Sequence, residues 1–199
     1  KALAVTRLLL DLDERNIPYI IFINKIDGTE PKVKETFDAL QDLTERPLVL
    51  REIPLRDGDQ ITGYVDLVSE RAYAYKKGKP SDLIEVPASE LSRKEEERTK
   101  LLESLADFND ELMEQLLEDV IPGTQEVYQN LAKDMQDGLI VPVFFGSAEN
   151  DNGVKRLMKA LRHETPEIAQ TTERLGIGEG ESMAQVFKVY HGAQSGKLC

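Results

Sequence analysis

The sequence predicts an α/β fold built on a parallel sheet with helices packed against it. Residues 19–23 form an unbroken run of apolar, mostly β-branched and aromatic side chains, whose length suits a strand buried on both faces. Residues 139–145 form a second run of this kind. A helical pattern precedes the first run and another follows the second, and strands alternating with helices are typical of a parallel sheet.

The helices beside these runs follow from apolar spacing. Residues 2–15 carry leucines and valines at helical intervals before a charged end, so we expect a helix that packs on the sheet. Residues 31–43 predict a second helix, with Val33, Phe37 and Leu40 on one face. The stretch 152–162 predicts an amphipathic helix after the second strand.

The middle of the chain predicts a small antiparallel sheet followed by helices. Strand-like runs cover 47–55, 61–67 and 72–75, with a turn signal at 56–59 and a polar loop over 80–88. Helices are expected over 89–106, 110–117 and 124–135. Thr124 is expected to cap the last helix. The doublets Leu112-Met113 and Leu116-Leu117 are expected in the core.

Polar residues follow the first buried strand directly, as Asn24-Lys25-Ile26-Asp27. Ligands of open α/β sheets bind beyond the carboxyl ends of the strands. A carboxylate such as that of Asp27 matches the two adjacent donors of guanine, N1–H and N2–H2. The Lys25 stem could lie along a purine face, and Asn24 could tie this loop to the base or to a phosphate loop. A plain polar turn is the alternative.

Small residues follow the second strand, as Gly146-Ser147-Ala148. Small side chains let the backbone approach a flat ring closely. The amide of Ala148 could donate to guanine O6, where adenine carries an amino group. An ordinary strand-to-helix turn explains this segment alone, but two such strand ends together favour a guanine site.

These two motifs resemble the guanine-specificity motifs of the translational GTPases. The text between them resembles elongation factor G, most specifically IPLRDGDQITGYVDLVSERAYAY (53–75) and RTKLLESLADFNDELMEQLLED (98–119). The resemblance covers essentially the whole chain. It implies a partial P-loop GTPase-type parallel sheet with helices, an inserted α+β subdomain, and a truncated β-barrel start at the C-terminus.

The resemblance also implies domain boundaries. We expect the first part of the GTPase core, with the Asn-Lys-x-Asp motif, over 1–46 and the inserted subdomain over 47–137. The chain is then expected to re-enter the GTPase core, with the Gly-Ser-Ala motif, over 138–168. A linker over 169–182 and the start of a second, β-barrel domain over 183–199 are expected to follow. The chain opens with Lys1 inside a helical pattern and stops at Cys199. We therefore expect it to be an internal segment of a longer protein.

The expected nucleotide-binding residues are Asn24, Lys25, Asp27, Ser147 and Ala148, and the expected ligand is GTP or GDP. The sequence has no Gly-x-x-x-x-Gly-Lys-[Ser/Thr] phosphate loop. The resemblance places that loop, the Mg²⁺ site and the residue that orients the attacking water outside this segment. We therefore expect no catalytic or metal-binding residue here, and GTP hydrolysis only by the full-length parent.

The resemblance implies the ribosome as a partner, with the insertion as a candidate contact for the ribosomal stalk. The sequence leaves four subfamilies open: a housekeeping translocase, an elongation factor G-like paralogue, a ribosomal protection protein and the GTPase release factor. Of these we favour the paralogue. The alternative from another class is a non-hydrolysing module that docks a partner through its acidic helices.

The charge and composition of the chain limit the kinds of partner that it can bind. The net charge of −12 argues against a large direct contact with nucleic acid, since phosphate binding rests on Lys and Arg. The lysines at 76, 77 and 79 could touch RNA, but a solvated hairpin tip is favoured.

Carboxylates in the helices of the insertion are spaced as on solvated helix faces, and no set of His or Cys residues accompanies them to bind a metal. No apolar run approaches the ~20 residues that span a membrane, and a single cysteine suits a reducing cytoplasm.

Overall fold

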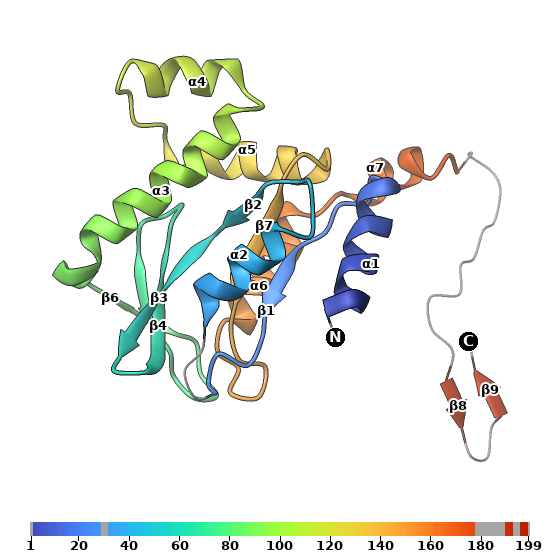
Figure 1. The fold of residues 1–199 in the computed structure, drawn as a ribbon, viewed down its shortest axis with the longest axis horizontal. Coiled ribbons are helices and arrows are strands. Elements are labelled where there is room, and N and C mark those ends of the chain that lie inside the picture. The colour runs from blue at the N-terminus through green and yellow to red at the C-terminus, as the bar shows by residue number, and fades with distance from the viewer. Residues whose placement is uncertain (1, 29–31, 178–189, 193–195, 199) are drawn as a thin grey trace. The chain divides into compact units, whose positions relative to one another are not determined.

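The computed structural model describes residues 2–28, 32–177, 190–192 and 196–198. The chain divides into two units, Lys1–Thr165 and Pro166–Cys199, and each is described by itself. The first unit combines a parallel three-stranded sheet with a larger antiparallel sheet and surrounding helices, which confirms the predicted α/β class (Figure 1). None of the described helices has the length and apolar character that crossing a membrane requires.

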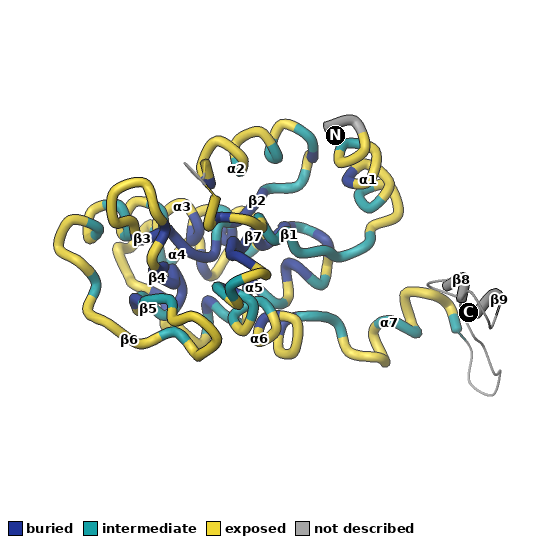
Figure 2. Tube along the Cα trace, turned by 90° about the horizontal axis from the view of Figure 1, so that it is seen from below, coloured by how far each residue is buried: buried dark blue, intermediate teal, exposed yellow. Residues whose placement is uncertain are grey.

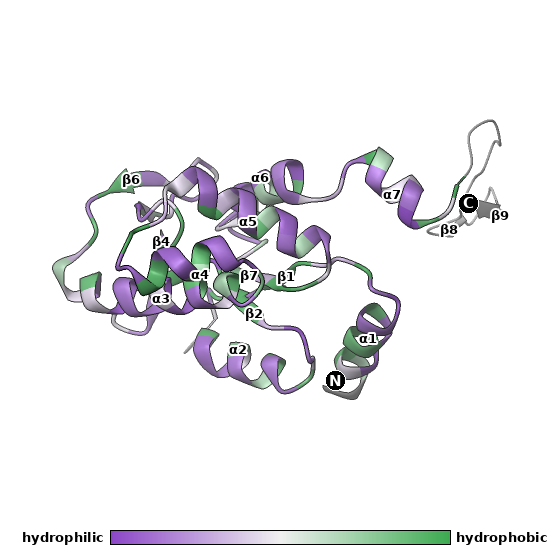
Figure 3. Cartoon of the chain, turned by 90° about the horizontal axis from the view of Figure 1, so that it is seen from above, coloured by the Kyte–Doolittle hydropathy of each residue, from purple (hydrophilic) through white to green (hydrophobic). Residues whose placement is uncertain are grey.

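The parallel sheet has the order β1-β7-β2, from Ile21–Ile23, Val141–Phe145 and Leu48–Leu50. Central β7 is buried at every position, as expected of an apolar strand with neighbours on both sides. Strand β1 is only half-buried, so the expectation of burial on both faces is wrong for it. Within the described residues β1 is an edge strand. Figure 3 shows the hydrophobic colouring of β1 and β7.

The antiparallel sheet has the order β3-β4-β5-β6, from Glu52–Asp57, Gln60–Asp66, Ala72–Ala74 and Asp82–Ile84. Gly58, with φ +57°, makes the expected turn between β3 and β4. The expected strand over 47–55 is instead two strands, because the chain changes sheets at Arg51. Strand β6 lies where we expected a loop. Its residues are all exposed, so no alternation of apolar side chains marks it.

The helices of the middle region are η1 (Ala88–Glu90), α3 (Leu91–Ala106), α4 (Asp110–Leu117) and α5 (Thr124–Gln136). Gly123, not Thr124, is the N-cap of α5, because its carbonyl already accepts the amide of Val127 at 3.1 Å. In α4 only one member of each doublet is internal. Leu112 is fully buried and Leu116 packs on the core, whereas Leu117 is 78% exposed.

The largest hydrophobic core lies where α3, α4 and α5 cover the start of the antiparallel sheet. Its members include Ile53, Val65, Leu105, Leu112 and Leu131. Figure 2 shows these buried positions gathered around β7, β3 and β4, with the helices exposed along their outer sides. The core therefore spans both sheets, because β3 continues the chain directly from β2.

The remaining helices lie close to their predicted positions. They are α1 (Ala2–Glu14), α2 (Val33–Gln41) and α6 (Val154–Glu164). Helix α6 begins two residues later than expected, because Gly153 adopts φ +74° at its N-cap.

In the second unit, helix α7 (Ile168–Arg174) occupies the beginning of the expected linker, 169–182, and starts one residue before it. Strands β8 (Tyr190–Gly192) and β9 (Gly196–Leu198) pair antiparallel. Most of residues 183–199 lies outside the described residues, so the expected start of a β-barrel stays a prediction.

Candidate functional site

The carboxyl ends of β1 and β7 lie side by side, and this brings the two predicted motifs together. Ile23 stands opposite Phe145 in the parallel register. Beyond these residues the ladder continues into the loops, because the amide of Gly146 donates to the carbonyl of Ile23 at 2.9 Å and the amide of Ile26 donates to that of Gly146 at 3.2 Å. The main chains of the two motif loops are therefore directly bonded.

The Asn24 side chain joins the two motifs a second time. Its Oδ1 accepts the amide of Ala148 at 2.9 Å and the amide of Lys25 at 2.8 Å. The sequence suggested that Asn24 ties its loop to the base or to a phosphate loop; within this structure its side chain instead bonds the amide of Ala148. The Ala148 amide, our candidate donor to a base oxygen, is thus already oriented by Asn24.

The Asp27 carboxylate joins the two loops separately, through a residue that the sequence did not mark. Asn150 donates its side-chain Nδ2 to Asp27 Oδ2 at 2.8 Å, and the same Nδ2 lies 3.3 Å from Ser147 Oγ. Asp27 itself is exposed, so its other oxygen is open to a ligand. The sequence signal for Asn150 was only a polar loop after Ala148.

Lys25 and Ile26 are neighbours in the first motif but have opposite environments, one exposed and the other buried. Ile26 is 2% exposed and packs with Val33 and Phe145, which anchors the loop to the core. Lys25 has φ +65°, an uncommon backbone conformation for a residue with a side chain, and is exposed. Lys25 has no ion-pair partner among the described residues. Its ammonium is therefore available to solvent, as the sequence analysis expected.

The second motif is a tight turn that only glycine fits at its first position. A Cβ on Gly146 would lie 2.2 Å from the carbonyl oxygen of Asn152 and 2.6 Å from the Phe22 ring. Ser147, 1% exposed, exchanges main-chain hydrogen bonds with Asn152 at 2.9 and 3.0 Å. The turn is thus closed on itself, and its Ala148 corner is presented at the surface.

The buried carboxyl group of Glu52 holds the last residue of β7, directly before this turn. Glu52, fully buried, accepts the amide of Phe145 on Oε1 at 3.1 Å, while its Oε2 has no hydrogen-bond partner. Burial raises the pKa of Glu52 to about 7, although Arg156 and the Phe145 amide favour its charged form. In the sequence Glu52 is a polar residue in a strand-like run, so no pattern identified it as part of the candidate site.

Two ion pairs hold β7 and α6 against the inserted sheet. Arg51 forms a bidentate pair with Glu164, at 2.5 and 3.2 Å, and Arg156 pairs with Asp66 at 2.7 and 2.8 Å. Both guanidinium carbons lie 5.1 Å from the Phe144 ring centroid, so the ring is flanked by two cations. These contacts fix the strand that leads into the Gly-Ser-Ala turn.

The site residues lie at the end of two parallel strands and offer a carboxylate, main-chain amides, amide side chains and an ammonium. This donor and acceptor set fits a purine that presents two donors beside an acceptor. Within the described part of the chain, no group of three or more His, Cys, Asp or Glu side chains is placed to hold a metal ion.

Comparisons with known proteins identify the family and several relatives of this chain. Residues 3–167 match the elongation factor Tu GTP binding domain. The chain is 37% identical over 193 residues to an elongation factor G-like protein of Synechocystis sp., covering 96% of this chain and 29% of that protein. It is 32% identical over 175 residues to elongation factor G 1 of Borreliella burgdorferi, covering 85% of this chain and 25% of that one. A crystal structure from Thermus thermophilus superposes with a TM-score of 0.78 at 26% identity, over 96% of this chain and 28% of the other. The chain thus spans less than a third of the length of these relatives.

Proposed function

The chain belongs to the elongation factor Tu GTP-binding domain family, and on that basis we propose that it supplies the guanine-recognition half of a GTP/GDP site. One observation carries the proposal. Two hydrogen bonds, between Asn24 and Ala148 and between Asp27 and Asn150, join two strand ends that are far apart in the sequence, and Asn150 also donates to Ser147. A plain polar turn would not need this cross-linking.

Asp27 reads the base in this proposal. Its carboxylate accepts N1–H and N2–H2 of guanine together, which are charge-assisted hydrogen bonds. Adenine presents an acceptor at the same ring nitrogen, so the carboxylate would be left unpaired there. Sites built on such matched groups reject the wrong ligand by about 10⁴-fold.

Ala148 reads the guanine oxygen. Its amide donates to O6, in place of or shared with Asn24 Oδ1, which keeps a second donor in the Lys25 amide at 2.8 Å. Turning this amide toward the base therefore leaves Asn24 hydrogen-bonded. The stem of Lys25 lies along one face of the purine with its ammonium in water.

The parent protein hydrolyses GTP on the ribosome in translation elongation, in the cytoplasm, with the phosphate groups and Mg²⁺ held by residues outside this sequence. Among the subfamilies we favour an elongation factor G-like paralogue. The higher identity to a protein of that name, 37% against 32% for an elongation factor G, supports this choice. The chain alone, which has no phosphate loop, carries out no hydrolysis.

Binding of fluorescent GDP to the full-length parent, with GTP and ATP as competitors, tests the proposal. We expect GTP to displace the probe and ATP to leave it bound. Asp27→Asn removes the charged acceptor and is expected to shift preference from guanine to xanthine nucleotides. Asp38→Asn is the matched control, because Asp38 is an exposed carboxylate of α2 that pairs loosely with Lys34 at 3.7 Å. Equal competition by ATP, or an Asp27→Asn variant that keeps its guanine preference, would contradict the assignment.

A second candidate is a docking function of the insertion, favoured by exposed apolar residues around the end of α4. Leu117 is 78% exposed and Ile121 is 80% exposed, and Ile121 lines a hollow of about 460 Å³ together with Leu116, Val120 and Pro122. A ribosomal protein such as the stalk is the expected partner. Pull-down with purified ribosomes, comparing Leu117→Ser with Leu83→Ser in exposed β6, tests it. Unchanged ribosome binding by Leu117→Ser would exclude this surface.

A further inference from the structure

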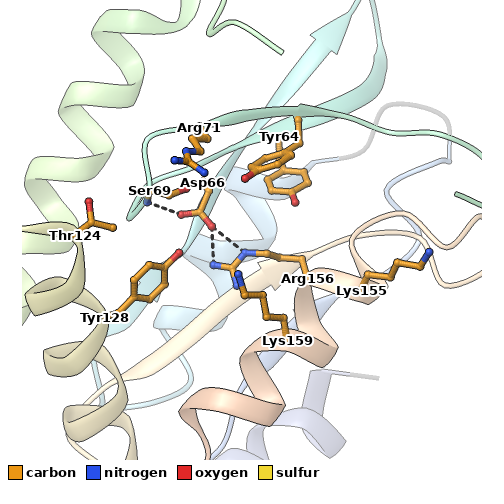
Figure 4. Close-up of a pocket in the computed structure, with 10 residues that line it drawn as sticks. Tyr64, Asp66, Ser69, Arg71, Thr124, Tyr128, Lys155, Arg156 and Lys159 are labelled. Atoms are coloured by element: carbon orange, nitrogen blue, oxygen red, sulfur yellow. Dashed lines mark hydrogen bonds and ion pairs between the residues drawn. The ribbon is translucent and has the colours of Figure 1, made fainter. Parts of the chain in front are cut away.

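A polar cavity of about 520 Å³ lies apart from the strand-end site, where the antiparallel sheet meets α5 and α6 (Figure 4). The residues that line it are Tyr64, Asp66, Ser69, Arg71, Tyr73, Thr124, Tyr128, Lys155, Arg156 and Lys159. None of them belongs to the guanine-recognition network. Volumes of this size are typical of small-molecule sites.

The one carboxylate in the lining is already neutralised. Asp66 Oδ2 contacts Arg156 at 2.7 and 2.8 Å, while Oδ1 accepts the amides of Val68 and Ser69 at 3.0 and 2.9 Å. Burial opposes the charged form of Asp66, but Arg156, Arg51 and the two amides outweigh it, so the pKa of Asp66 lies below its usual range. Asp66 and Arg156 together therefore add no net charge to the cavity.

Three further cations line the cavity without a carboxylate of their own. Arg71, Lys155 and Lys159 have no ion-pair partner among the residues that the structure describes. Figure 4 shows Lys159 extending from α6 toward the Asp66–Arg156 pair, and the Tyr128 hydroxyl directed toward the same pair from α5. In a chain of net charge −12, this concentration of unpaired positive charge stands out.

The cavity also carries neutral donors and ring surfaces. Ser69 and Thr124 offer hydroxyl groups, and Tyr64 stacks on Tyr73 with ring centroids 5.1 Å apart. A second hollow of about 370 Å³ shares Tyr128, Arg156 and Lys159, and extends the space along α5 and α6.

We propose that this cavity is a binding site for a small molecule that carries phosphate. The uncompensated cations of Arg71 and Lys159 match a multiply charged anion, and the hydroxyl groups complete its hydrogen bonds. The tyrosine rings provide apolar surface for an organic group attached to the phosphate. A concave lining fits a small ligand better than an extended nucleic-acid strand, which needs a long basic stripe.

Isothermal titration of the 199-residue chain with inorganic pyrophosphate tests the proposal. We expect saturable binding that is unchanged in the Asp27→Asn variant, because no residue of the cavity belongs to the guanine site. The double variant Arg71→Gln/Lys159→Gln is expected to weaken binding at least tenfold. The control is Arg162→Gln, which removes one positive charge from α6 at an exposed position outside both hollows. It is expected to change affinity less than twofold.

Comparing AMP with pyrophosphate distinguishes an organic phosphate from a free one. Tighter binding of AMP identifies the rings as part of the site, and weaker binding identifies inorganic phosphate chemistry alone. The proposal is overturned if pyrophosphate does not bind, or if Asp27→Asn or Arg162→Gln weakens binding as much as the double variant. Thermal unfolding of each variant confirms that these substitutions leave the fold intact.

Discussion

The side-chain amide of Asn150 donates to the carboxylate of Asp27 at 2.8 Å, across 123 positions of the sequence. Asn150 stands on the turn after β7, and Asp27 on the loop after β1. The bond fixes the plane of a carboxylate that would otherwise rotate freely at the surface. Orienting a charged acceptor before the ligand arrives lowers the entropy lost on binding.

Asn150→Ala is expected to weaken GDP binding by the full-length parent about tenfold, the order expected for one hydrogen bond to a charged group. Preference for guanine over adenine is expected to remain, because Asp27 is still present. Titration with fluorescent GDP measures both. Glu149→Ala, an exposed change in the same turn, is the control and is expected to have little effect. An unchanged dissociation constant in Asn150→Ala would show that Asp27 needs no support.

Gly146→Ala is expected to destabilise the fold by about 1–3 kcal/mol and to abolish GDP binding, since the new methyl group meets backbone and a packed ring. Urea unfolding and GDP titration measure the two effects. The matched control is Gly123→Ala, where a Cβ meets no atom within 4 Å. Equal stability of the two variants would mean that the Gly-Ser-Ala turn relaxes easily.

Glu52 makes stability depend on pH. Its pKa is about 7 in the folded state and near 4.5 when unfolded, so between these values the folded state holds a proton that the unfolded state has lost. The free energy of unfolding therefore falls as pH rises from about 4.5 to about 7, and this contribution levels off above pH 7. The total change is on the order of 3 kcal/mol.

Glu52→Gln removes this dependence, because glutamine keeps an oxygen for the Phe145 amide and does not ionise in this range. Urea unfolding at pH 5 and at pH 8 is the measurement. The stability difference between the two pH values is expected to be smaller in the variant than in the wild type. Parallel pH profiles for the two proteins would show that Glu52 does not titrate on folding.

Glu164→Gln is expected to cost about 3–5 kcal/mol of stability, because Arg51 is fully buried and would lose the charge it faces. Glu35→Gln is the control, since Glu35 pairs with Lys32 at the surface and such pairs contribute about 0–1 kcal/mol. Chemical unfolding measures both variants. A loss below about 1 kcal/mol in Glu164→Gln would mean that water or another group compensates Arg51.

The sequence predicted the elements whose apolar pattern is long or sharply bounded. Strand β7 and helices α1, α3 and α6 lie close to where periodicity placed them, and the apolar residues of β7 and α3 are buried in the core. Strand β6 was missed because it is exposed at every position and is held by pairing with β5 rather than by burial. The break at Arg51 was missed because burial of an arginine depends on Glu164, which is remote in the sequence.

In the candidate site, too, some residues could be predicted from the sequence and others could not. Asn24, Asp27 and Ala148 were predicted from residue type and from their place after buried strands. Asn150 and Glu52 act through partners from distant parts of the chain, so only the folded arrangement reveals them. Their contributions depend on the register of β1 against β7, which periodicity alone does not determine.

The pairing of β2 with β7 has a consequence for engineering. Strand β2 lies within the residues expected to form the insertion, yet it completes the parallel sheet. Deleting residues 47–137 to obtain a minimal domain would leave one side of β7 without a partner strand and expose apolar residues such as Val141 and Val143. Such a product would present an unprotected β edge and would self-associate. A shortened protein should therefore retain residues 47–50 and replace only the chain beyond them.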